Sequence, residues 1–358
     1  MALLSAGGTG GHLFPAEALA VALKARGHGV TLITDTRARP FLDTFPADRV
    51  EMVAASTLAG RSPVAMAKML ATNGIGFVRS LKIIREAKPD VAVGFGGYPT
   101  LAPLNAANFL KVPAVVHEAN AVPGRANRSL ARFAHVATSF PTVPGFAKPR
   151  SVTFVGMPVR PAVTAAARPY EAPGETFRLL VFGGSQGARV FADLVPPALA
   201  ALPEAERARL RVTQQCRPED MDRVRAAYAA AGIEAELASF FRDLPERMAA
   251  AHAVVARSGA STVAELSVIG RPGLLVPLPG AIDQDQAHNA AAFAAAGAGI
   301  HLPQAELTPA KLSGEIERIM NDPAWLAKAA AAASGFARPD AAGELASLIE
   351  RIAEFGAP

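Results

Sequence analysis

The sequence predicts an α/β protein built from two doubly wound parallel-sheet domains in series. Short apolar segments alternate with longer alanine-rich segments throughout the 358 residues, which is the order expected of βαβ units. The succession of strand, glycine loop and helix opens the chain and starts again at residue 177. A chain of this length also suits two hydrophobic cores better than one.

The expected strands of the first half are continuous apolar runs, as parallel strands covered on both faces should be. The chain opens with a strand at 2–6, a glycine loop at 7–11 and a helix at 15–26. Further strands are expected at 29–34, 91–95, 114–117 and 154–158.

The second half repeats this pattern. It opens with a strand at 177–182, a glycine loop at 183–187 and a helix from Arg189, followed by strands at 211–215, 253–256 and 273–276. We expect one domain over 1–157 and a second over 158–337, with the last helices at 324–333 and 343–355. Residues 338–358 are expected to pack back on the first domain.

Composition excludes several classes of protein. Hydrophobic residues make up 51% and charged residues 19%, values typical of a globular chain rather than a disordered one. No signal peptide is recognisable, and the longest uncharged stretch, 91–110, holds too many glycines, prolines and asparagines for a spanning helix. Any membrane contact should therefore be peripheral. The single cysteine, Cys216, cannot form an internal disulfide, and we interpret it as structural.

The net charge of +5 and pI of about 9.6 indicate a polyanionic partner. Zinc-finger spacing and aromatic-rich RNA-binding strands are absent from the sequence, so we expect no nucleic acid.

The two glycine loops, GGTGGH at 7–12 and GGSQGAR at 183–189, indicate phosphate binding. Glycine permits close backbone approach, and a loop's amides together with a helix N-terminus attract anions. The alternative is a tight turn that binds nothing. Asp35 ends the second strand, as an NAD-binding acid would, but neither loop has the glycine spacing of the dinucleotide fingerprint or the lysine of a P-loop.

Polar residues cluster at other expected strand ends. In the second half, Glu265 follows a strand and a glycine turn; it could accept ribose hydroxyls or could belong to a capping box with Ser261 and Thr262. Asp283 and Asp285 mimic a D-x-D metal motif, but acids are favoured in a helix's first turn anyway, so we expect no metal.

In the first half, His12 closes the glycine loop, where an imidazole is a candidate base. Polar and glycine residues end two further strands: Gly96, Gly97 and Tyr98 on one, and His117, Glu118 and Asn120 on the other.

Seven ordered segments together resemble the MurG family, the bacterial UDP-N-acetylglucosamine:lipid I N-acetylglucosaminyltransferases of glycosyltransferase family 28. They are GGTGGHLFPA, GFGGYPTLAP, HEANAVPGRANR, GMPVR, GGSQGAR, RSGASTVAEL and DQDQAHNA. The resemblance implies the GT-B fold, two Rossmann-like domains facing across a cleft, with an N-terminal acceptor and membrane-side domain and a C-terminal donor domain. Ala119 and Asp285 stand where glutamine is frequent in the family.

The resemblance also implies residue roles. It places His12 as the base, with Glu118 as second choice, and Tyr98 and Asn127 on the acceptor side. Positions matching contacts to UDP-N-acetylglucosamine are Thr9, Gly10, Gly11, Asn120, Arg160, Ser185, Phe241, Ala260, Ser261, Thr262, Val263, Ala264, Glu265 and Gln286. The implied reaction is inverting, gives lipid II for peptidoglycan synthesis, and needs neither cofactor nor metal.

The implied partners are UDP-N-acetylglucosamine, lipid I and an anionic membrane surface, at the cytoplasmic face of the bacterial inner membrane. Between Met52 and Arg85 there is no acid. Cations alternate there with apolar residues: Arg61, Lys68, Arg79, Lys82 and Arg85 with Met66, Met69, Leu70, Ile75, Phe77 and Val78. Such a segment can seat on anionic lipid, or it can be core with a solvated face.

Three other functions remain open on the sequence alone. The chain could be a GT-B UDP-sugar transferase acting on a glycerolipid, a UDP-sugar epimerase, or a non-catalytic UDP-sugar-binding protein.

Overall fold

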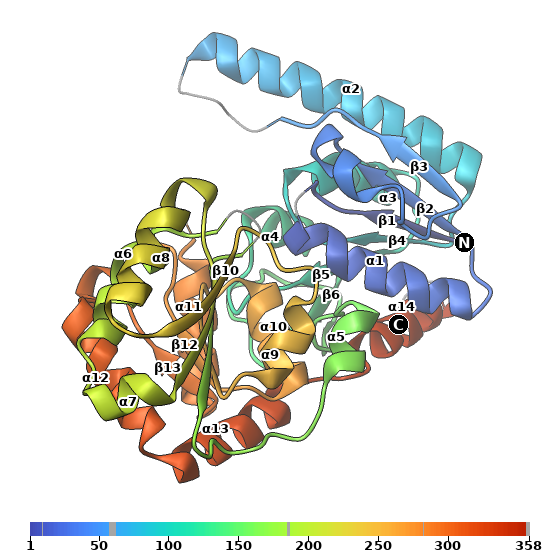
Figure 1. Ribbon diagram of the computed structural model, residues 1–358. Coiled ribbons are helices and arrows are strands. Elements are labelled where there is room, and N and C mark those ends of the chain that lie inside the picture. The colour runs from blue at the N-terminus through green and yellow to red at the C-terminus, as the bar shows by residue number, and fades with distance from the viewer. Residues whose placement is uncertain (9, 57–61, 185–186, 282, 356–358) are drawn as a thin grey trace. The chain divides into compact units, whose positions relative to one another are not determined.

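Two compact units, each an all-parallel sheet between helices, make up the protein (Figure 1). The computed structural model describes residues 1–8, 10–56, 62–184, 187–281 and 283–355. Unit 1 consists of Met1–Arg160 and Arg338–Pro358, and unit 2 of Pro161–Ala337. The predicted fold class is confirmed.

The sheet of unit 1 has the strand order β3-β2-β1-β4-β5-β6-β7. Its strands are β1 (Ala2–Ser5), β2 (Val30–Thr34), β3 (Arg49–Met52), β4 (Val91–Gly94), β5 (Ala114–Glu118), β6 (His135–Thr138) and β7 (Val152–Phe154). Strand β1 lies between β2 and β4, with Leu4 opposite Leu32 on one side and Val93 on the other.

Helices cover both faces of this sheet because its strands are apolar on both faces. They are α1 (Gly10–Ala25), α2 (Pro63–Ala87), α3 (Leu101–Phe109), α4 (Arg125–Leu130) and α14 (Ala341–Phe355). Leu4 belongs to a core cluster with α1 and α14, whereas its neighbour Leu3 packs in a cluster with α2 and α3. The C-terminal helix thus completes the core of unit 1.

The sheet of unit 2 has the order β10-β9-β8-β11-β12-β13. Its strands are β8 (Phe177–Phe182), β9 (Leu210–Gln215), β10 (Glu234–Ala238), β11 (Ala253–Ala256), β12 (Gly273–Leu275) and β13 (Gly299–His301). Its helices are α5 (Pro161–Ala166), α6 (Arg189–Ala200), α7 (Glu204–Arg209), α8 (Met221–Ala230), α9 (Leu244–Ala250), α10 (Ala260–Ile269), α11 (Asp285–Ala295), α12 (Pro309–Met320) and α13 (Pro323–Phe336). Cys216 is buried in the main core cluster of this unit.

The structure corrects several expected element boundaries. The strand expected at 154–158 is instead β7, which ends at Phe154, because Gly156 adopts a positive φ of 82° and Pro158 has no amide to donate. The first helix begins at Gly10, ahead of the expected Pro15. Strands β3, β6, β10 and β13 escaped prediction; β3 and β10 lie at sheet edges and carry charged residues that interrupt the apolar pattern.

Across the described ranges, none of the helices combines the length and apolarity that a membrane span requires.

Arg271 joins three segments of unit 2, and no acid among the described residues forms an ion pair with it. Its side chain is buried and donates to the carbonyls of Ala249, Ile269 and Gly270, at the ends of α9 and α10, and to that of Arg168. Burial lowers the pKa of Arg271 to about 10. Helix C-terminal carbonyls favour a cation, so they compensate the buried charge.

We expect Arg271→Met to reduce the free energy of unfolding of unit 2 by about 3 kcal/mol, because several buried carbonyls lose their donor. Differential scanning calorimetry measures this as a lower melting temperature. Arg225→Met is the matched control, since Arg225 pairs with the fully exposed Asp222. Equal melting temperatures for the two variants would show that Arg271 contributes nothing special.

Candidate functional site

The candidate residues lie in loops at the carboxyl edges of the two sheets. Because all strands within a sheet are parallel, the loops after neighbouring strands meet at the same edge. In unit 1 these are the loops after β1, β2, β4 and β5. In unit 2 they follow β8, β9, β10, β11 and β12.

His12 lies in a slot made by glycine backbone. It sits in the first turn of α1, and its ring is flanked by Gly7, Gly96 and Gly97. A Cβ atom added to these glycines would lie 3.2, 3.3 and 3.4 Å from the imidazole. The loops after β1 and β4 therefore hold the ring between them. Among the other predicted loop residues, Gly11 is exposed with open space beside it, and Thr9 lies outside the described residues.

Asp35 holds the first glycine loop from the neighbouring strand end. Its carboxylate accepts the amide of Gly8 at 3.4 Å and the amide of Arg37 at 2.8 Å, and it pairs with the Arg37 guanidinium. Burial opposes ionisation, but the hydrogen bonds from Arg37 outweigh it and keep the pKa of Asp35 below its usual value. Asp35, which in the sequence resembled the acid of an NAD-binding site, therefore binds groups of the protein itself.

Glu118 is at the end of β5, where its buried carboxylate organises the following loop. It accepts hydrogen bonds from the backbone amides of Asn120 (3.0 Å) and Gly124 (2.9 Å) and from the side-chain amides of Asn127 (2.9 Å) and Asn120 (3.3 Å). Burial raises the pKa of Glu118, and these donors offset it only in part. Asn127 also donates to the carbonyl of His117. The structure thus brings the predicted residues Glu118, Asn120 and Asn127 into one network.

His117 is fully buried beside this network. Its Nε2 lies 3.0 Å from the carbonyl oxygen of Gly156, so this nitrogen carries the proton, while no hydrogen-bond partner within the described chain reaches Nδ1. Burial lowers the pKa of His117 to about 4, a charge on His12 lowers it further, and the bond to Gly156 works in the opposite direction. His117 is therefore neutral at physiological pH.

Two further predicted residues, Arg160 and Tyr98, each take part in a contact between a cation and an aromatic ring. Arg160 stacks over the ring of Phe14 in α1, with 4.7 Å from its guanidinium carbon to the ring centre. Tyr98 begins the short helix η2 (Tyr98–Thr100), and Arg37 lies over its ring at 5.0 Å.

The glycine loop of unit 2 is anchored by Gln215, which sequence reasoning missed. The Gln215 side chain, at the end of β9, accepts the amide of Gly183 at 3.0 Å and donates to the carbonyl of Ser239 at 3.2 Å. It thereby joins the loop after β8 to the segment after β10 that leads to Phe241. The sequence contains one sign of this role, a polar residue at the carboxyl end of an apolar strand. Ser185 lies outside the described residues.

Phe241 is buried, and the Arg247 guanidinium stacks over its ring at 4.3 Å. The neighbouring Phe240 is exposed instead. The ring of Phe241 is therefore packed inside the unit.

Helix α10 begins earlier than expected, and this overturns the capping-box interpretation of Glu265. Its N-cap is Gly259, and no side chain caps it. Ser261 and Thr262 lie inside the helix, and Glu265 lies in its second turn, beyond the reach of a capping box. The remaining predicted positions of this segment, Ala260, Val263 and Ala264, belong to the same helix start.

Gln286 holds the loop after β12. Its side-chain oxygen accepts the amide of Leu278 at 3.0 Å, and its carbonyl accepts the hydroxyl of Ser258 at 2.8 Å. Asn289 reaches back from α11 to the carbonyl of Ser258. The loops after β11 and β12 are thus joined. Helix α11 begins at Asp285, and in the ranges that the structure covers no three His, Cys, Asp or Glu side chains gather as a metal site would require.

Family comparison matches both units. Residues 2–139 match the glycosyltransferase family 28 N-terminal domain, and residues 178–345 match the family 28 C-terminal domain. Both opening glycine loops lie within these matched ranges.

Similar proteins span nearly the whole chain. A curated protein of Methylobacterium nodulans is 54% identical, covering 99% of this chain and 97% of its own length, and one of Brucella canis is 52% identical, covering 98% and 94%. Both are named UDP-N-acetylglucosamine--N-acetylmuramyl-(pentapeptide) pyrophosphoryl-undecaprenol N-acetylglucosamine transferase. The crystal structure of Acinetobacter baumannii MurG is 27% identical with a TM-score of 0.81, covering 98% of this chain and 99% of that one.

The buried His117 should make folding pH-dependent. Its pKa is about 4 in the folded state against about 6.5 when unfolded, so its stabilising contribution is complete above pH 6.5 and is lost as the pH falls toward 4. We expect about 2 kcal/mol of this contribution to be lost between pH 7.5 and pH 5. Urea unfolding at the two pH values measures the difference.

His117→Gln should flatten that pH dependence, whereas the control His288→Gln, at an exposed position of α11, should leave it as in the wild type. A wild-type slope retained in His117→Gln would contradict the assignment.

Proposed function

This chain belongs to glycosyltransferase family 28, and we propose that it transfers N-acetylglucosamine from UDP-N-acetylglucosamine to N-acetylmuramyl-(pentapeptide) pyrophosphoryl-undecaprenol, known as lipid I. The product is lipid II, the precursor of peptidoglycan. One observation carries the proposal: close relatives with this activity in their names match the chain end to end.

Unit 2 is the donor unit in this proposal. The diphosphate of UDP lies at the loop 183–187, the uracil at the backbone of Phe241, and the ribose at Glu265. Helix α6 follows this loop with its positive dipole end toward the carboxyl edge of the sheet. Gln286 and Asn120 contact the sugar. The hydrogen bonds of Gln215 and Gln286 support this arrangement because they fix the loops that would surround the donor.

Unit 1 is the acceptor unit, and His12 is the base. Its imidazole is held by glycine backbone at the carboxyl edge, where substrates of doubly wound sheets bind. We assign Glu118 to positioning instead, because four N–H donors already occupy its buried carboxylate. Gly10 and Gly11 lie beside the donor sugar and the acceptor phosphates, and Tyr98 and Asn127 shape the acceptor side.

The reaction is a single displacement with inversion at the anomeric carbon. The acceptor hydroxyl attacks that carbon as His12 takes its proton. The bond from the carbon to the β-phosphate oxygen breaks, and its electron pair leaves with UDP. Backbone amides aimed at the phosphate are worth roughly 3 kcal/mol each in comparable sites, so the loop 183–187 stabilises the leaving group.

We expect His12→Ala to reduce kcat roughly 10²- to 10⁴-fold, because the attacking hydroxyl loses its base. Transfer of labelled N-acetylglucosamine to lipid I measures kcat, and calorimetric titration with UDP shows that donor binding persists. His28→Gln is the matched control, because His28 precedes β2 and so lies at the opposite edge of the same sheet. Unchanged turnover in His12→Ala would remove His12 as base.

The same assay tests the function itself. Wild-type protein should transfer to lipid I and not to diacylglycerol. Transfer to diacylglycerol would favour a glycerolipid enzyme, and UDP-sugar binding without turnover on either acceptor would indicate a binding protein.

Helix α2 is the membrane side of this proposal. Its N-terminal half extends beyond the strands of its unit (Figure 1), and Leu70, Ile75 and Val78 are more than 60% exposed rather than core. Phe77, by contrast, packs on the core, and Arg61 lies outside the described residues. Exposed apolar residues beside Lys68 and Arg85 suit the cytoplasmic, anionic face of the bacterial inner membrane.

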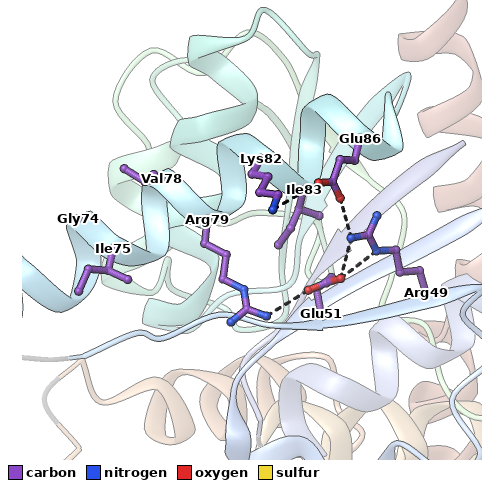
Figure 2. A pocket seen from close by; sticks show the side chains of 9 residues that line it. All are labelled: Arg49, Glu51, Gly74, Ile75, Val78, Arg79, Lys82, Ile83 and Glu86. Carbon is purple, nitrogen blue, oxygen red and sulfur yellow. Dashed lines mark hydrogen bonds and ion pairs between the residues drawn. The ribbon is translucent and has the colours of Figure 1, made fainter.

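A groove of about 730 Å³ continues this face down to the edge strand β3. Figure 2 shows Ile75 and Val78 above it, with Arg49, Arg79 and Lys82 in ion pairs with Glu51 and Glu86. The two carboxylates therefore reduce the positive charge that this part of the helix presents.

Replacing Lys68, Arg79 and Lys82 by glutamine should weaken binding to phosphatidylglycerol vesicles at least tenfold, since a cation near an anionic surface contributes about 1 kcal/mol and two of the three are partly paired. Vesicle co-sedimentation measures it. The control replaces Lys311, Arg318 and Lys328 of unit 2. Equal binding by both triple variants would discard the α2 face as the membrane contact.

A further inference from the structure

We infer that Arg37 binds the pyrophosphate of the lipid acceptor. The inference rests on the proposed function, and it concerns a residue for which neither the sequence motifs nor the comparisons supply a role. The structural basis is a set of contacts that places this cation across the two glycine loops of unit 1.

The first contact is between the turn after β2 and the glycine loop after β1. A Cβ atom on Gly8 would lie 2.5 Å from the Asp35 carboxylate, 2.6 Å from the amide nitrogen of Ala38 and 2.7 Å from the Cβ of Arg37. Only a glycine allows this approach. The start of the Arg37 side chain is therefore fixed directly against the loop proposed to bind phosphate.

The second contact is between the Arg37 guanidinium and the segment that follows the glycine loop after β4. Arg37 lies 5.0 Å above the ring of Tyr98, which directly follows Gly96 and Gly97. These same two glycines flank the His12 imidazole. The cation thus extends from the loop after β1 to the loop after β4, the two loops that hold the proposed base.

The third observation is that Arg37 is held and yet open to solvent. The Asp35 carboxylate accepts hydrogen bonds from Nε of Arg37 at 3.0 Å and from one of its terminal nitrogens at 2.6 Å. The Arg37 side chain is 44% exposed, whereas the Asp35 side chain is only 10% exposed. Asp35 is thus the buried member of the pair, and Arg37 is the one that solvent reaches. A guanidinium has five N–H donors, so this pairing leaves donors for a ligand in a fixed orientation.

These features fit an anionic group such as a pyrophosphate better than a neutral sugar. A planar, preoriented guanidinium matches phosphate oxygens in two-point hydrogen bonds. Helix α1 begins directly after this glycine loop, and the amides of its first turn can add further donors for the same dianion. Fixing the side chain in advance also lowers the entropic cost of binding.

The test compares Arg37→Ala and Arg37→Lys with the matched control Arg39→Ala, two positions along the same short helix η1 (Thr36–Phe41) and exposed. Two acceptors are used: lipid I and an analogue in which a monophosphate replaces the pyrophosphate. For Arg37→Ala we expect the KM for lipid I to rise roughly 10- to 100-fold. The KM for UDP-N-acetylglucosamine should stay unchanged.

Discrimination between the two acceptors separates ligand binding from a purely structural role. The wild-type preference in kcat/KM for the pyrophosphate acceptor should shrink about tenfold or more in Arg37→Ala and less in Arg37→Lys, which keeps the charge but not the fork. Arg39→Ala should retain the wild-type preference.

Three results would overturn the inference: unchanged kinetics in Arg37→Ala, an equal loss on both acceptors, or a change confined to the donor KM. If Arg37→Ala does not fold, Arg37→Gln, which keeps an N–H donor for Asp35, gives the same comparison. Failure of the proposed function is distinguishable, because the wild type would then transfer to neither acceptor.

Discussion

Close approach of backbone to backbone at glycine is the constraint on which the candidate site of unit 1 depends. Gly8 lets the turn after β2 pack directly on the loop after β1, and Gly7, Gly96 and Gly97 leave the space in which the His12 ring lies. Gly96 and Gly97 also adopt positive φ values, which side chains resist. The imidazole thus takes its position from main chain, which is more rigid than a shell of side chains.

Buried polar side chains also fix the loops of the candidate site. Asp35, Glu118 and Gln215 each follow or end a strand, and each binds backbone amides of a neighbouring loop. A carboxylate or amide in this position compensates for its own burial by hydrogen bonding, and it fixes the loop in return. Through Asp35 this restraint reaches the glycine loop that leads into α1 and His12.

The two units have the same architecture. Each covers a parallel sheet with helices on both faces, so that polar groups of the central strands can reach a ligand at the strand ends. In unit 1 the covering helices include α14, which comes from the far end of the chain and packs with α1 around Leu4. The long helix α2 departs from this rule, because it exposes apolar side chains that a covering helix would bury.

The sequence by itself determined the fold class and the start of each half, because apolar runs and glycine loops report local backbone requirements. Most candidate residues came from the resemblance of its ordered motifs to glycosyltransferase family 28. It also indicated that Glu118, Asn120 and Asn127 matter. Only the tertiary structure decided what they do: four donors converge on Glu118 from a loop that folds back. Arg37 and Gln215 stayed unnoticed, and Glu265 remained ambiguous until the start of α10 was known. Their roles depend on which strand lies next to which, and strand order is set by long-range packing that local pattern does not encode.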